Sequence, residues 1–255
     1  MKVLLNNSRK RGAQGLTLIE LVVVLAILVA LVGLVLAFFP GLLSKASKST
    51  SASSIQDVAR AVQINYTQSL SYGTGYDSLL DSTGASQFAK LPNAVIAQIT
   101  PTLFGATDVT ALASLGVTSY RYMLNVANDA TFAVSSPTLT TISTTVKGAL
   151  LTDTTVQTAV RGNYTPVGTA AYYVFGLGKG SSIVGTGNIL NDAPVRAGSN
   201  ANENPTTSYQ RYGLVFLVDD SGAAGARNAR FLGACAFAST GITTAEGNLQ
   251  QYYSN

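Results

Sequence analysis

The chain has 255 residues, of which 11% are charged, well below the roughly 25% of ordinary soluble domains. It contains no histidine and a single cysteine, Cys235, so the commonest general base and an intramolecular disulfide are both excluded. The formal net charge is +4, but four of the 16 basic residues lie in the first eleven positions, and the other 12 balance the 12 acids. The rest of the chain is therefore neutral, which disfavours nucleic-acid binding.

The amino-terminal segment joins a basic leader to a long apolar run. The leader carries Lys2, Arg9, Lys10 and Arg11 and ends at Gly15. Leu16-Thr17-Leu18-Ile19-Glu20 follows, and then 19 apolar residues from Leu21 to Phe39. As a helix this run would be roughly 29 Å long, close to the thickness of a bilayer core. It predicts a transmembrane segment over 16–39, with the leader in the cytoplasm by the positive-inside rule.

Glu20 is the one charged residue in this segment. A carboxylate inside a transmembrane helix costs about 2.5 to 3.5 kcal/mol near the bilayer centre, so such a residue is functional by default. No cation lies within a helical turn of it. The partner is therefore expected from a lipid headgroup, another subunit, or a new amino terminus made by cleavage of the chain.

These residues resemble the amino terminus of type IV pilin-like proteins, and most of all the pseudopilins of type II secretion. The resemblance covers about the first forty residues. It implies that a prepilin peptidase removes the leader 1–15 by cutting between Gly15 and Leu16, and that Leu16 is then N-methylated. It also implies that Glu20 meets the amino terminus of a neighbouring subunit during assembly. The sequence departs from the family pattern at Leu16, where Phe or Met is usual, and at Pro40, three residues later than the usual bend.

Two other interpretations of the amino terminus are weaker. A secretory signal has a shorter apolar core of about 7 to 15 residues, and a Glu at its start would be unusual. A plain membrane anchor for a periplasmic binding protein or enzyme explains the hydrophobicity, but leaves Gly15 and Glu20 unexplained.

The resemblance implies an α+β pilin fold, in which a long amino-terminal helix packs on an antiparallel sheet with additional short helices. The expected boundaries are 16–39 for the transmembrane half of the helix, 40–72 for its outer half and 73–255 for the head. Some melting is expected after Pro40. Helical spacing independently predicts an apolar face that packs on the head, made by Ile55, Val58, Ala59, Val62, Tyr66 and Leu70.

The head is expected to contain short elements separated by polar loops. Helices are predicted at 91–99 and 108–115, the second capped by Thr107, and strands at 120–124, 131–134, 170–175, 212–218 and 230–237. The Thr-rich segment 138–158 is ambiguous, and 176–205 is predicted to be a loop.

Catalytic and cofactor motifs are weak. Gly176 to Ser182 is rich in glycine but lacks the Walker spacing, so a plain turn is favoured over a phosphate site. Cys235 lies in an apolar run and is expected to be buried.

Asp219 and Asp220 could bind calcium, since major pseudopilins often carry a calcium loop and paired carboxylates suit a hard cation. A hairpin turn is the commoner role of such a pair. Asp192 could join the site, but no spacing places it there.

The sequence thus predicts a non-enzymatic filament subunit in the inner membrane, with its head in the periplasm. Its expected partners are copies of itself, other pilins or pseudopilins, prepilin peptidase and an inner-membrane assembly platform. Whether it forms a pilus or a secretion pseudopilus stays open, as does its status as a major or minor subunit.

Overall fold

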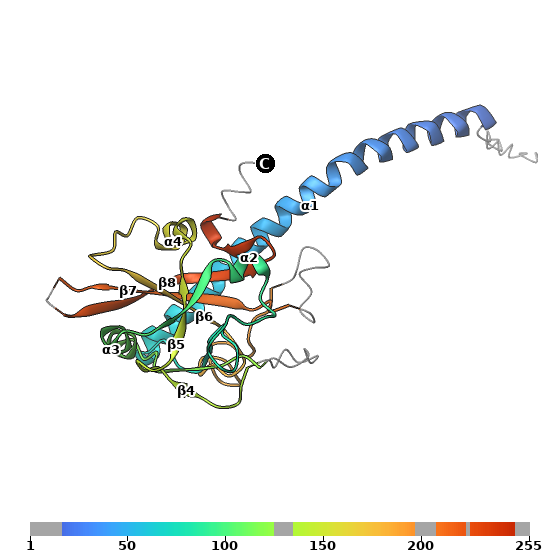
Figure 1. Ribbon diagram of the computed structural model, residues 1–255. Helices are drawn as coiled ribbons and strands as arrows, with labels where there is room; N and C mark the ends of the chain where they lie inside the picture. Colours follow the sequence, from blue (N-terminus) through green and yellow to red (C-terminus); the bar gives the residue numbers. More distant parts are fainter. Residues whose placement is uncertain (1–16, 125–134, 197–207, 223–224, 248–255) are drawn as a thin grey trace, which may run out of the picture. The chain divides into compact units, whose positions relative to one another are not determined.

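A computed structural model describes residues 17–124, 135–196, 208–222 and 225–247 (Figure 1). The leader 1–15, both residues of the expected cleavage site and the predicted strand 131–134 lie outside these ranges. The chain divides into two compact units, residues 1–44 and residues 45–255. The helices are α1 (Leu18–Ser69), α2 (Asn93–Ile96), α3 (Ala106–Ser114) and α4 (Thr154–Arg161). The strands are β1 (Tyr76–Asp77), β2 (Ile99–Leu103), β3 (Ser119–Arg121), β4 (Thr140–Thr141), β5 (Lys147–Leu151), β6 (Ala171–Gly176), β7 (Tyr212–Asp220), β8 (Arg227–Ala238) and β9 (Gly241–Thr243).

Helix α1 is 52 residues long and continues through Pro40, so the predicted melting after that residue is wrong. A proline removes one backbone donor and strains one turn, which a helix of this length can contain without ending. The helix ends where Leu70 adopts a φ of 54° and donates its N–H to the Tyr66 carbonyl at 2.7 Å. A left-handed residue of this kind is a common helix terminator, although glycine usually supplies it.

No helix in the described part of the chain is both long enough and apolar enough to cross a membrane. The prediction of a transmembrane helix over 16–39 is therefore wrong, and so is the single-pass inner-membrane localisation that depended on it. The count of apolar residues was not sufficient evidence, because a helix that is apolar on all sides can equally well be covered by other protein.

The head is built on a nine-stranded mixed sheet with the strand order β4-β3-β1-β6-β7-β8-β9. Strand β5 also pairs with β6 and carries β2 on its other edge. Strands β1 and β3 are parallel, whereas the other strand pairs are antiparallel. Figure 1 shows β7 and β8 as a long hairpin, and a register shift between Val215 and Phe216 interrupts their pairing.

The predicted pilin fold, a transmembrane helix on a purely antiparallel head, is corrected accordingly to a mixed sheet with short helices. The physical reason is the long connection between β1 and β3, which contains α2, β2 and α3. Such an excursion lets the chain return in the same direction, and hydrophobic patterns within single strands do not reveal this.

Two apolar clusters lie on opposite faces of the central strands, because successive strand residues point to opposite sides. One cluster joins Ile55, Val58 and Val62 of α1 to Phe175 and Phe216. The predicted helix face is confirmed at those three α1 positions, but Leu70 is 75% exposed because the helix has already ended. The other cluster contains side chains of α2 and α4 packed on alternate residues of the same strands, including Tyr172, Val174, Val215 and Leu217.

The short head elements were predicted in part. Helices α2 and α3 fall within or overlap the predicted ranges, but α3 begins after Gly105, with no side-chain cap, rather than at Thr107. Strands β3, β6, β7 and β8 overlap predicted strands. The ambiguous segment 138–158 contains β4, β5 and the start of α4, which Asp153 caps by accepting from the N–H groups of Thr155 at 2.8 Å and Val156 at 3.1 Å.

Candidate functional site

Glu20 lies in the first turn of α1, where it forms a reciprocal cap with Thr17. The Thr17 N–H and hydroxyl donate to Glu20 Oε2 at 2.8 and 2.9 Å. The Glu20 N–H in turn donates to Thr17 Oγ1 at 3.4 Å. This arrangement is a capping box, which satisfies helix N–H groups that would otherwise lack partners.

The capping box gives Glu20 a partner that the sequence analysis missed. The signal was present, because Thr17-Leu18-Ile19-Glu20 has the Thr-x-x-Glu spacing of the motif. The backbone hydrogen bond from Thr17, followed by its hydroxyl, holds the pKa of the Glu20 carboxyl below its ordinary 4.5. The group is therefore a carboxylate at neutral pH, and it can still accept further donors.

The described start of α1, from Leu18 to Val32, exposes apolar side chains on every side. Leu18 and Val29 are 81% and 71% exposed. The other large apolar side chains, each about half exposed or more, are Ile19, Leu21, Val22, Val23, Val24, Leu25, Ile27, Leu28, Leu31 and Val32. Contiguous apolar surface on this scale marks an interaction site. Because Glu20 is the single charge from 17 to 33, this segment is an apolar rod with one carboxylate in its first turn.

Asp219 and Asp220 lie at the end of β7, where they organise the loop before β6. Asp219 is buried and accepts from the Tyr164 hydroxyl at 2.5 Å and the Val167 N–H at 3.1 Å. Asp220 accepts from the Thr169 N–H at 3.0 Å. Both carboxylates thus accept hydrogen bonds from the loop before β6, as expected of residues next to a hairpin turn.

The described residues contain no group of three or more Asp, Glu, His or Cys side chains that could hold a metal ion. Asp192, the third residue considered for calcium, instead forms an exposed ion pair with Lys179 at 3.6 Å. The structure therefore does not bring the three carboxylates together, and calcium binding at Asp219 and Asp220 gains no support from it.

The glycines of the 176–180 loop are explained by packing. A Cβ at Gly176 would lie 2.1 Å from the Tyr209 hydroxyl, and a Cβ at Gly178 would lie 2.2 Å from Asp77 Oδ1. Asp77 is fully buried and accepts from Tyr209 at 2.6 Å, and burial raises its pKa despite that hydrogen bond and the nearby Arg211 charge. The glycines of this loop thus lie against protein side chains. This agrees with the interpretation of the segment as a plain turn and not as a phosphate-binding loop.

Gly178→Ala should lower the free energy of unfolding by about 1 to 3 kcal/mol, because the added methyl overlaps the Asp77 carboxyl and forces the loop to shift. Urea denaturation of the full chain measures this. Gly178 has no positive φ, so the overlap with Asp77 is the expected cause of this loss. Gly187→Ala, with open space around its Cβ and a φ of 86°, measures separately what a methyl group costs at a positive φ. A change of less than about 0.5 kcal/mol on Gly178→Ala would show that the loop moves away from Asp77 at little cost.

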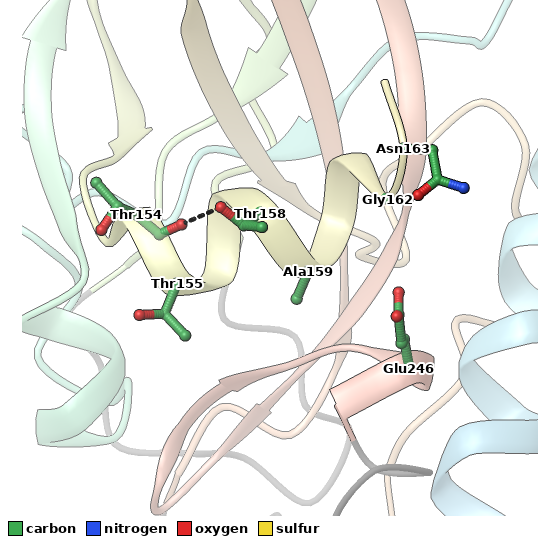
Figure 2. Close-up of a pocket in the computed structure, with 7 residues that line it drawn as sticks. All are labelled: Thr154, Thr155, Thr158, Ala159, Gly162, Asn163 and Glu246. Atoms are coloured by element: carbon green, nitrogen blue, oxygen red, sulfur yellow. Dashed lines mark hydrogen bonds between the residues drawn. The ribbon is translucent and has the colours of Figure 1, made fainter. Parts of the chain in front are cut away.

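A surface groove of about 650 Å³ lies along α4. It is lined by Thr154, Thr155, Thr158, Ala159, Gly162, Asn163 and Glu246. Figure 2 shows Glu246 pointing toward the end of α4, where Gly162 and Asn163 lie. The Thr158 hydroxyl donates to the Thr154 carbonyl at 2.9 Å. Glu246 is the one ionisable side chain of this lining, so the groove offers no acid and base pair for catalysis.

Cys235 is fully buried in the second apolar cluster, as the sequence predicted. Burial raises the pKa of its thiol to about 12, so the reactive thiolate is scarce at neutral pH. We expect the native chain to react with a thiol reagent at least 100-fold more slowly than the urea-unfolded chain, measured by the absorbance of released thionitrobenzoate. Equal rates would show that the strand carrying Cys235 opens readily.

Searches of protein-family models, curated proteins and solved structures found no match to this chain.

Proposed function

We propose that this chain is a structural filament subunit. In this proposal a prepilin-type peptidase cuts between Gly15 and Leu16, and the chain then assembles through the amino-terminal part of α1. The observation that supports it best is the exposed apolar rod from Leu18 to Val32, which has one carboxylate at its start. A helix that is apolar on all sides is covered in its working form, and parallel copies of the same helix would cover it.

The apolar area supplies most of the proposed cohesion. Twelve large apolar side chains in this segment are about half exposed or more. Complete burial of a Val, Leu or Ile side chain contributes about 1.5 to 3 kcal/mol, so covering the exposed halves contributes roughly 10 kcal/mol per subunit. This is comparable to the roughly 4 to 15 kcal/mol of lost translational and rotational freedom, so several neighbours around each helix are needed.

Glu20 supplies specificity in this proposal. Cleavage after Gly15 creates an amino group at Leu16, directly before the capping residue Thr17. In an apolar filament interior, a carboxylate of one copy and the ammonium of the next favour the single register that brings them together. The capping box fixes the carboxylate at the helix start before a second copy arrives.

The proposed role is structural and not catalytic. The whole chain lacks histidine, its one cysteine is buried, and the described groove carries a single ionisable group. The head between residues 45 and 247 would then form the outer surface of the filament or contact other subunits.

The intact mass and the amino-terminal sequence of the protein from its own cells test this proposal. We expect a chain that begins at N-methylated Leu16, recovered in a sedimenting filament fraction. Gly15→Asp should block cleavage and leave the filament fraction empty. A chain that still begins at Met1 in cells with an active prepilin peptidase would overturn the proposal.

A further inference from the structure

Thr17 marks the point at which α1 begins. Its carbonyl accepts the first hydrogen bond of the helix, from the Leu21 N–H at 3.2 Å, and the helix starts at Leu18. The Thr17 N–H lies outside this pattern, because it donates to Glu20 Oε2 at 2.8 Å. A helix that continued toward the amino terminus would need the same N–H for the carbonyl of Ala13. The capping box therefore competes directly with extension of α1 to earlier residues.

The sequence just before Thr17 does little to prevent such an extension. Ala13, Gln14 and Leu16 are all good helix formers. Gly15 is the one residue from 13 to 16 that opposes a helix. A helix that included Thr17 would give up the hydrogen bonds of its N–H and hydroxyl to Glu20. The start of α1 at Leu18 therefore depends on the capping box as well as on Gly15.

The proposed cleavage site lies next to this start, since the Gly15–Leu16 bond comes one residue before Thr17 in the sequence. Its hydrolysis adds water across the amide and leaves a carboxylate on Gly15 and an ammonium on Leu16. Peptidases cut segments outside regular structure, and the rate follows the population of the open form when opening is faster than cleavage. Helices lengthen and shorten within about 1 μs, whereas enzymes turn over about 1 to 1,000 times per second. The position of the helix start thus controls the fraction of chains that can be cut.

We propose that the capping box of Thr17 and Glu20 positions the chain for cleavage, by stopping α1 before it reaches the Gly15–Leu16 bond. This inference rests on the proposed function, in which a prepilin-type peptidase cuts that bond. Thr17 is then a positioning residue, which acts through the helix start and not through a contact with the peptidase. Glu20 has a role before assembly as well, because its carboxylate holds the Thr17 N–H in the uncut chain.

Capping predicts a different order of substitutions at Thr17 from recognition of its side chain by the peptidase. Ser, Asn and Asp cap a helix at least about as well as Thr, whereas Val and Ala do not. Val has nearly the same shape as Thr, whereas Asp differs in shape and carries a charge. A peptidase pocket that recognises the shape of Thr17 would accept Thr17→Val and reject Thr17→Asp. A capping role requires the reverse order.

Pulse labelling of the full chain in its own cells measures this order, because loss of the leader 1–15 changes the mobility of the chain on a gel. Thr17→Val and Thr17→Ala should lengthen the half-life of the uncut chain about two- to fivefold, since loss of a cap shifts a helix start by a factor of about five. Thr17→Ser, Thr17→Asn and Thr17→Asp should restore cleavage. Thr50→Val is the matched control, because it removes a hydroxyl within α1, bonded to the Ala46 carbonyl at 3.0 Å, and should leave cleavage unchanged.

Hydrogen exchange tests the cause of slow cleavage. The full uncut chain is purified from cells without prepilin peptidase, and the exchange of the backbone N–H groups just before Thr17 is followed by mass spectrometry. Thr17→Val should slow this exchange at least about twofold, because part of the molecules then include these groups in the helix. Thr17→Asn should leave it at the wild-type rate.

Three results would overturn the inference: cleavage of Thr17→Val at the wild-type rate, slower cleavage without slower exchange, or rejection of Thr17→Asp with acceptance of Thr17→Val. Each of them leaves the proposed function intact as long as the wild-type chain is cut after Gly15. A wild-type chain that stays uncut in cells with an active prepilin peptidase overturns the proposed function, and this inference with it.

Discussion

Replacing Glu20 by Gln should reduce filament yield at least tenfold while leaving the start of α1 intact. The amide of Gln can take the place of the carboxylate in a capping box, so the hydrogen bonds with Thr17 can persist. What the substitution removes is the negative charge, and close interfacial charge pairs can contribute about 1.5 to 7 kcal/mol. The measurement is the amount of sedimented filament per cell, with the cleaved subunit quantified in parallel.

Substitutions at Thr17 separate the cap from the charge. Thr17→Ala removes the hydroxyl but keeps the Glu20 charge and the Thr17 N–H, so it should cost about 1 kcal/mol of helix stability and lower the filament yield modestly. Thr17→Ser keeps a hydroxyl and is the matched control. If Glu20→Gln assembles as well as the wild type while Thr17→Ala does not, Glu20 serves only as a capping residue.

The charge pair also predicts a pH window for assembly. The Thr17 hydrogen bonds lower the pKa of Glu20 in the folded helix, so their contribution is present above its ordinary 4.5 and is lost as the pH falls through the lowered value. The partner amino group loses its charge near pH 8 by the usual value for an amino terminus, about 7.7 to 8.0. Assembly followed by light scattering should therefore be strongest between these limits, and Glu20→Gln should remove the acid limb of the profile.

Arg227→Met should lower the free energy of unfolding by about 3 to 5 kcal/mol, a large part of the roughly 5 to 15 kcal/mol of a typical domain. Arg227 forms an ion pair with Asp108, whose side chain is 6% exposed. It also donates to the carbonyls of Thr169 and, at 2.8 Å, Val218. Loss of the guanidinium leaves the Asp108 carboxylate buried, with the Tyr173 hydroxyl at 2.6 Å as its remaining described donor.

Urea denaturation of the full chain, followed by circular dichroism, measures this effect. The double variant Asp108→Asn with Arg227→Met removes both charges and should be more stable than Arg227→Met alone. Arg60→Met removes an exposed arginine without a described partner and should change stability by less than about 0.5 kcal/mol. A small effect of Arg227→Met would show that solvent reaches Asp108 in the native protein.

Local patterns were sufficient to predict some elements and some burial. The three- and four-residue spacing of Ile55, Val58 and Val62 predicted the buried face of α1, because residues at this spacing share one side of a helix. The apolar setting of Cys235 predicted its burial. The capping box at Thr17 and Glu20 was readable by the same local logic, although the membrane interpretation of Glu20 hid it.

Other features could not be read from short segments. Strand β2, which pairs with β5, was not predicted. It contains Pro101, and a proline weakens the strand signal of a short segment because it removes a backbone donor. Asp77 and Asp108 look like surface residues in the sequence, but lie in the interior because Tyr209 and Arg227 reach them from 132 and 119 residues away. For Asp219 and Asp220, the structure agrees better with residues next to a hairpin turn than with a calcium site.

By itself, the sequence determined the apolar rod, the single carboxylate at its start, the inner face of α1 and the strands with the strongest apolar patterns. These depend on contacts between residues a few positions apart, which periodicity records directly. The tertiary structure decided the parallel pairing of β1 with β3, the buried Asp108 and Arg227 pair, and the partners of Asp219 and Asp220. These contacts join chain segments more than forty residues apart. No local pattern specifies which distant segment will pair with a given strand or side chain.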